Sequence, residues 1–84
     1  MTRFKQMYLT SQVRRGIHDS RQLATALQWL QEIQPDPTLL TWAEEVCNYI
    51  CGLITSKEWA KPLAAFAAGL LDPWFELRFQ RGEP

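Results

Sequence analysis

Side chains that could perform catalysis are few in this sequence, and they do not cluster. The single histidine, His18, stands beside Asp19 in a polar, arginine-containing stretch where we expect solvent exposure, whereas acid–base catalysis needs such a group held in a pocket by a second residue. The four glycines are isolated, so the sequence has no glycine-rich phosphate-binding loop. Glu44 and Glu45 are adjacent, and adjacent residues on a helix do not converge on one point. We therefore predict a chain that is not an enzyme and uses no cofactor.

The two cysteines, Cys47 and Cys51, are four residues apart, which places both thiols on one face of a helix. A structural zinc site usually needs four ligands in two close pairs, and this sequence has no second pair of Cys or His. We therefore predict no metal site and interpret both cysteines as buried apolar residues. Because no secretory signal and no membrane-spanning stretch is evident, we expect reduced thiols in a cytoplasmic protein.

The N-terminal quarter of the chain is a candidate binding segment. Residues 1–21 carry five basic residues and one acid, a net charge of +4, whereas residues 22–55 carry four acids and no Lys or Arg, a net charge of −4. The rest of the chain is balanced, so the total is zero. Either the two blocks pair with each other in the fold, or their segregation marks a polarised surface for a partner. The five basic residues are Arg3, Lys5, Arg14, Arg15 and Arg21.

Helical patterns dominate the middle of the chain. Apolar residues recur at helical spacing over 20–34, after Asp19 or Ser20 as a cap and before a proline-rich turn. A second and largely apolar helix is predicted over 38–54, started by the Asp36–Pro37 pair, and Thr41–Glu44 also has the pattern of a capping box. A helix this apolar must be covered on most of its circumference.

The remaining segments give weaker patterns. Thr55–Glu58 has the sequence of another capping box, and Pro62 predicts a short helical turn followed by a new start, or a kink. Asp72–Pro73 predicts the start of a final segment, and the N-terminal stretch would end at Gly16. We predict that both terminal segments are helical. The fold class is then all-α, a compact bundle of four to five short helices; an α-rich fold with a two-stranded sheet from the termini is the alternative.

The chain has 84 residues and 46% hydrophobic residues, which suit one domain over 1–84. Ten residues are aromatic, four of them tryptophan, and a chain this short buries only about 60–65% of the surface it exposes when unfolded. We therefore expect some apolar surface to remain for a partner. Because tryptophan and arginine are enriched at binding hot spots, the predicted contact residues add Trp59, Trp74 and Phe79 to the five basic residues.

We predict a small protein that binds another protein, as an adaptor, a subunit or an inhibitor of a larger machine. An inhibitor encoded by a phage or plasmid is one form of this interpretation. Nucleic-acid binding through the basic residues is the first alternative, although overall neutrality and the lack of a recognition helix speak against it. A structural homodimer is the second alternative.

Overall fold

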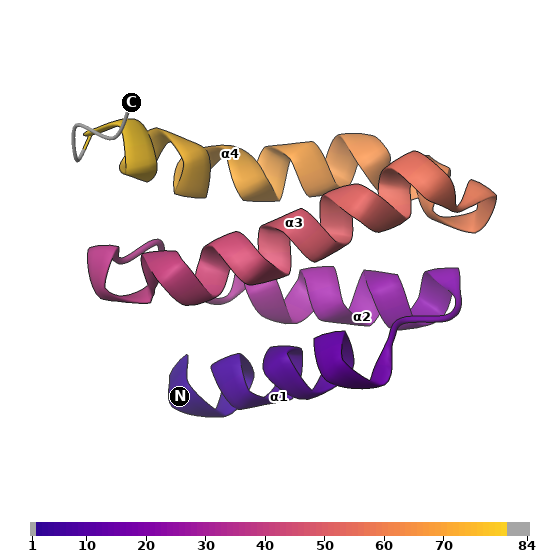
Figure 1. Ribbon diagram of the computed structural model, residues 1–84, viewed down its shortest axis with the longest axis horizontal. Coiled ribbons are helices and arrows are strands. Elements are labelled where there is room, and N and C mark those ends of the chain that lie inside the picture. Colours follow the sequence, from indigo (N-terminus) through magenta and orange to yellow (C-terminus); the bar gives the residue numbers. More distant parts are fainter. Residues whose placement is uncertain (1, 81–84) are drawn as a thin grey trace.

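The computed structural model describes residues 2–80, and all of its regular elements are helical (Figure 1). These residues contain no strand, so the all-α prediction is confirmed and the terminal sheet is not formed within them. No helix in this range is long and apolar enough to cross a membrane. The α-helices are α1 (Thr2–Arg15), α2 (Ser20–Gln31), α3 (Leu40–Ser56) and α4 (Ala64–Gln80), and two 3-10 helices, η1 (Pro37–Leu39) and η2 (Glu58–Leu63), precede α3 and α4.

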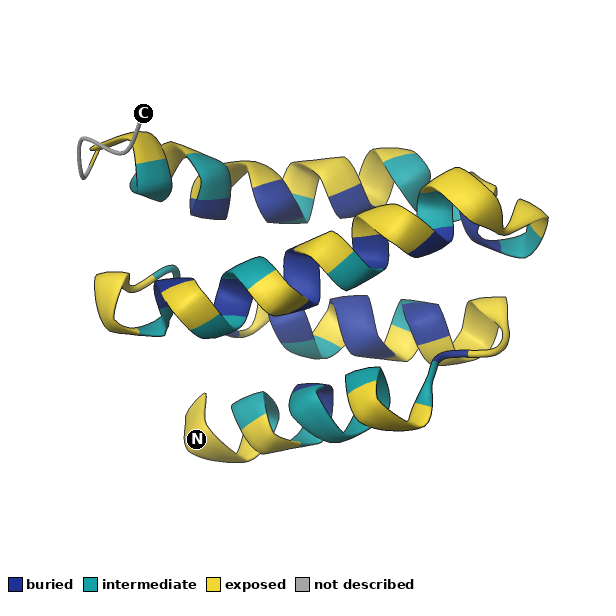
Figure 2. Ribbon diagram, viewed as in Figure 1, coloured by how far each residue is buried: buried dark blue, intermediate teal, exposed yellow. Residues whose placement is uncertain are grey.

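The four α-helices occupy the corners of a bundle. Helix α1 packs against α2 and α3, and α4 packs against the same two helices. Helices α1 and α4 therefore lie diagonally opposite each other, at the lower and upper edges of Figure 1. Each helix turns its dark-blue buried positions toward the interior in Figure 2.

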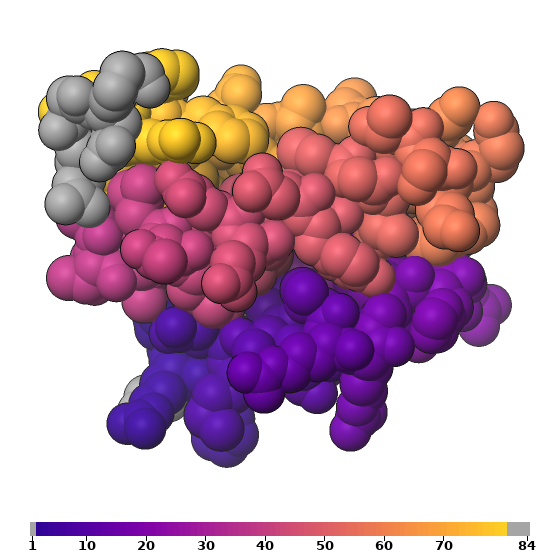
Figure 3. Space-filling view, viewed as in Figure 1, coloured from indigo at the N-terminus to yellow at the C-terminus, as the bar shows by residue number. Residues whose placement is uncertain are grey.

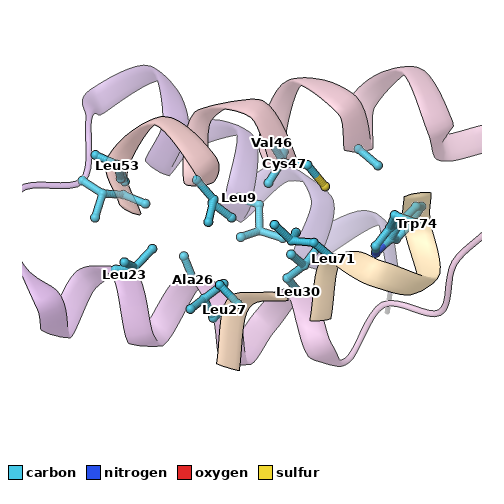
Figure 4. Close-up of a cluster of buried hydrophobic side chains, with 14 of the residues drawn as sticks. Leu9, Leu23, Ala26, Leu27, Leu30, Val46, Cys47, Leu53, Leu71 and Trp74 are labelled. Atoms are coloured by element: carbon cyan, nitrogen blue, oxygen red, sulfur yellow. The ribbon is translucent and has the colours of Figure 1, made fainter. Parts of the chain in front are cut away.

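One hydrophobic core fills the bundle, and most of it comes from α2 and α3. Helix α2 contributes Leu23, Ala26, Leu27 and Leu30, which are the residues that its apolar periodicity predicts. Helix α1, in contrast, contributes a single fully buried side chain, Leu9. Figure 4 shows these side chains meeting those of α3 and α4. The buried members from the latter two helices are Leu40, Ala43, Val46, Cys47, Ile50, Leu53, Ala67, Leu71 and Trp74.

A tight connection joins α1 to α2. Gly16 has φ of +88°, a conformation that favours glycine, and its N–H donates to Gln12 O at 2.9 Å, so α1 ends where the sequence predicts. The next residue, Ile17, is buried, and its N–H donates to the Tyr49 hydroxyl of α3 at 2.7 Å. Asp19 then caps α2 by accepting from Gln22 N–H at 2.8 Å, which confirms the predicted cap.

We expect Tyr49→Phe to lower the free energy of unfolding by about 1–3 kcal/mol, because it leaves the buried Ile17 N–H without its acceptor. Urea unfolding followed by circular dichroism measures the loss. Tyr8→Phe is the matched control, since the Tyr8 ring stacks on Trp29 and its hydroxyl makes no hydrogen bond within residues 2–80. Equal losses in the two variants would contradict a specific contribution from the Tyr49 hydroxyl.

Helix α2 ends at Gln31, three residues earlier than predicted. The N–H groups of Glu32 and Ile33 donate to carbonyls three residues back, at 3.2 and 3.1 Å, so the helix tightens before the proline-rich turn reaches it. Asp36 then caps η1 by accepting from both the N–H and the hydroxyl of Thr38, each at 2.9 Å. These two hydrogen bonds, the backbone one foremost, hold the pKa of Asp36 below its ordinary value.

Two predicted capping boxes do not form. The residue that caps α3 is Leu39, which provides no side-chain hydrogen bond, and Thr41 lies inside the helix. At the other end, Thr55 and Ser56 do not open a new element but extend α3. Their hydroxyls donate to the carbonyls of Cys51 and Gly52, at 2.8 and 2.7 Å, one turn earlier in the same helix.

Two prolines in the last part of the chain have different outcomes. Pro62 lies in η2 and α4 begins two residues later, as predicted for a short turn with a new start. Pro73, in contrast, lies inside α4, and the new segment predicted there is not formed. In a regular helix the N–H of residue 73 would donate to the carbonyl of Gly69, but proline has no N–H. Both residues are exposed, so water can hydrogen-bond to the Gly69 carbonyl instead.

Candidate binding surface

His18 lies on the surface, as predicted, in the connection before α2. Its backbone N–H donates to the Gln22 side-chain oxygen at 2.6 Å, and its ring lies close to Gly16. Within the described residues, no group of three or more His, Cys, Asp and Glu side chains is placed to hold a metal ion.

The two cysteines have different environments. Cys47 is buried in the core, as predicted, but Cys51 is exposed, so its predicted burial is wrong. The reason is geometric. Four residues make slightly more than one helical turn, so Cys51 is rotated around α3 relative to Cys47. The buried side of α3 is narrower than its apolar sequence indicates, and Cys51 lies outside it. Burial raises the pKa of the Cys47 thiol to about 12, with smaller contributions from Cys51 and Glu44.

We expect a thiol reagent at pH 8 to modify Cys51 in the folded protein and to spare Cys47. The thiolate is the reactive form, and a thiol whose pKa is about 12 stays protonated well above pH 8. Mass spectrometry counts the modified thiols, and Cys51→Ser is the control that should abolish the modification. Both thiols should react in urea; rapid modification of Cys47 without urea would contradict its burial.

The tryptophans of the bundle are mostly used in internal contacts. Trp74 is 3% exposed and lies edge-on to Trp42, with ring centroids 6.3 Å apart. The Trp42 ring N–H donates to the Thr10 hydroxyl of α1 at 2.9 Å, and Trp29 stacks on Tyr8 at 4.5 Å. Trp59 is partly buried against the core.

Large apolar side chains do reach the surface, but they are not the tryptophans. Phe4 is 72% exposed and Met7 62% exposed on α1, and Phe66 and Phe79 are 41% and 67% exposed on α4. The predicted contact at Trp74 does not fit its burial, because a partner could reach it only by opening the bundle. Sequence reasoning passed over Met7, although a signal was present: Phe4 and Met7 lie three residues apart on the side of α1 that Leu9 does not occupy.

The predicted contact residues do not form one surface. Arg3, Lys5, Arg14 and Arg15 lie on α1, Arg21 lies in the first turn of α2, Trp59 lies in η2 and Phe79 lies in α4. Because α1 and α4 are diagonally opposite, the basic residues of α1 and the exposed Phe79 are separated by the bundle (Figure 1). The three arginines of α1 instead line a groove with Met7, and Arg15 also lines the groove that contains Phe4.

The two charge blocks form one ion pair with each other in residues 2–80. Lys5 pairs with Glu32, the residue that follows α2, across 3.5 Å. Glu44, of the acidic block, pairs with Arg78 of α4 across 3.2 Å, and Arg78 does not belong to the basic block. Arg14 and Glu45 line the same small cavity between α1 and α3 but form no ion pair. Four arginines of the basic block therefore stay exposed and without an ion pair among the described residues: Arg3, Arg14, Arg15 and Arg21.

Two shallow grooves run along the outer side of α1, with Met7 and Ser11 on the ridge between them. The first is lined by α1 alone and has arginines at its ends and the neutral Gln6 and Thr10 between them. The second, of about 440 Å³, also includes Trp29 of α2. Figure 3 shows the side chains of α1 projecting from the lower edge of the molecule, away from the other helices. We call this face, formed by Arg3, Phe4, Met7, Tyr8, Arg14, Arg15 and Trp29, the α1 surface.

Comparison with protein-family models, with curated protein sequences and with solved structures finds no match to this chain.

Proposed function

We propose that this chain is a small non-catalytic protein that binds another protein through the α1 surface. The observation that carries the proposal is the exposure of Phe4 and Met7 on the outer side of one helix, bordered by arginines without ion pairs. Apolar side chains that are exposed together and rimmed by polar groups are typical of protein interaction sites. The arginines at both ends of the helix would steer an acidic partner toward this face.

The test is capture of a partner by tagged protein from the cells in which the chain is made, or from their host. We expect one stoichiometric partner with the original sequence and at least about a tenfold loss with the double variant Phe4→Ala and Met7→Ala. The matched control is Phe79→Ala, which removes an equally exposed phenylalanine from the opposite edge of the bundle. Capture that depends on Phe79 and not on the α1 pair would overturn the assignment of the surface.

Nucleic-acid binding is the second candidate, because the first groove of α1 has three arginines and no acidic residue. It predicts retention on heparin and an affinity that falls steeply with salt, both weakened by Arg14→Ala and Arg15→Ala. Absence of retention at low salt would remove this candidate. Sedimentation of the pure protein tests the homodimer, since a monomer at micromolar concentration contradicts it.

A further inference from the structure

The α1 surface has two chemically different edges. One edge is mainly apolar: Phe4 and the stacked pair of Tyr8 and Trp29 line the groove between α1 and α2, next to Met7 on the ridge, and the one cation that lines this groove is Arg15. The other edge is basic, with Arg3 near one end of α1 and Arg14 near the other. A ligand that fits both edges must place an apolar stripe beside a line of negative charge.

The distance between Arg3 and Arg14 sets the distance between the negative groups of the ligand. Arg3 and Arg14 are eleven residues apart, which is about three turns and about 16 Å along the helix. Between them lie the neutral Gln6 and Thr10, and the Thr10 hydroxyl is already engaged, donating to Gln6 O and accepting from Trp42. Of the other two cations of this helix, Lys5 is paired with Glu32, and Arg15 lies next to Arg14 at the end of α1, where it lines both grooves. Two separate carboxylates fit this pattern better than a continuous row of phosphates does.

A second copy of the chain does not fit the same face. In an antiparallel pair of α1 helices about a twofold axis, Arg3 of each helix would lie near Arg14 of the other. In a parallel pair, each arginine would lie near its own equivalent. Both arrangements bring like charges together, which disfavours a symmetric contact.

Resting on the function proposed above, we infer that the α1 surface binds an acidic amphipathic helix of the partner protein. Its apolar stripe covers Phe4, Met7 and the Tyr8–Trp29 pair, and two acidic residues about three turns apart on one side of the stripe meet Arg3 and Arg14. This is recognition of a helix by a groove, with the apolar stripe giving affinity and the two ion pairs at Arg3 and Arg14 fixing its orientation.

The probe is a dye-labelled synthetic helical peptide of about three to four turns, with a leucine stripe and two glutamates eleven residues apart on one side of it. A second peptide has the same composition but carries both glutamates on the other side of the stripe. Fluorescence anisotropy measures binding of each peptide to the full chain. We expect the first peptide to bind at least about tenfold more tightly than the second, because its two glutamates meet Arg3 and Arg14, whereas Arg15 is the one cation of α1 that lines the other groove.

Charge reversal on the protein tests the same contacts. Arg3→Glu with Arg14→Glu should weaken the first peptide at least about tenfold, and a peptide with lysines in place of the two glutamates should then bind the reversed protein. Arg21→Glu, a reversal of an exposed arginine outside α1, is the matched control and should leave binding within about twofold. Circular dichroism confirms that each variant keeps its helices.

Three results would overturn the inference. The first is equal binding of the two glutamate peptides, and the second is an unchanged affinity after reversal of Arg3 and Arg14. The third is preferential binding of a twelve-nucleotide single strand through the same arginines.

If no peptide binds while partner capture still depends on Phe4 and Met7, the inference of an acidic helical partner is wrong and the proposed protein-binding function stands. If capture does not depend on that pair, the proposed function fails independently of the peptides.

Discussion

Replacing Trp74 with alanine is expected to lower the free energy of unfolding by about 3–5 kcal/mol, a large part of the stability of a domain of this size. Trp74 is almost fully buried, where α4 faces α3, and its ring meets the ring of Trp42. Figure 4 shows it at one end of the core cluster. Its removal leaves a cavity that the surrounding helices fill only in part. Urea unfolding followed by circular dichroism gives the change directly.

Phe79→Ala is the control on the same helix, five residues further along. Its ring is mostly exposed, so we expect a change within about 0.5 kcal/mol. Losses of similar size in the two variants would contradict the burial of Trp74. The comparison also bears on function, because loss of partner binding in a Trp74 variant reports unfolding and does not identify a contact.

Leu9→Ala is expected to cost about 2–5 kcal/mol and to loosen α1 more than the other helices. Leu9 is the one fully buried side chain of α1. The other contacts of α1 are the partly buried Val13, the Tyr8–Trp29 stack, the Trp42–Thr10 hydrogen bond and the Lys5–Glu32 pair. Amide hydrogen exchange should therefore become faster in α1 than in α3, since local opening needs less free energy there.

Met7→Ala is the matched control for Leu9→Ala. The two side chains are two residues apart on α1, but Met7 is exposed, and we expect its removal to change stability by less than about 0.5 kcal/mol. If the amides of α1 keep their protection after Leu9→Ala, the helix is held by its other contacts and the dominant contribution of Leu9 is wrong. The α1 surface lies on this helix. Leu9→Ala should therefore also weaken partner binding, although Leu9 itself is buried and is not part of that surface.

Local chemistry accounts for the parts of the fold that the sequence predicts well. The Asp19 cap, the end of α1 at Gly16 and the break at Pro62 each depend on residues within one or two turns. The errors occur where local and tertiary preferences compete. Thr55 and Ser56 can cap a new helix or bond back to the previous turn, and the sequence does not decide between the two.

Pro73 shows the same competition in the opposite direction. Proline disfavours a helix interior by about 3 kcal/mol relative to alanine, so a break there is the natural prediction. Helix α4 continues because Leu71 and Trp74 on either side of it are anchored in the core. Tertiary packing therefore outweighs the local preference, and only the structure reveals that packing.

The candidate surface was only partly predictable. The basic character of the N-terminal segment and the presence of Phe4 and Tyr8 can be read from the sequence. Which aromatic rings are exposed depends on the helix pairing: Trp74 faces α3, whereas Phe4 lines the shallow groove beside α1 and stays mostly exposed. Residues predicted to act together, such as Arg3 and Phe79, are separated because α1 and α4 take opposite corners.

The order of the helices around the bundle also has a consequence for how the chain folds. Helices α1 and α2 are neighbours in sequence and in space, and so are α3 and α4, so each pair is a helical hairpin that closes over a short connection. Only the contacts between the two hairpins require distant parts of the chain to meet. Folding dominated by local contacts is fast, and we expect relaxation within microseconds to milliseconds in stopped-flow or temperature-jump experiments.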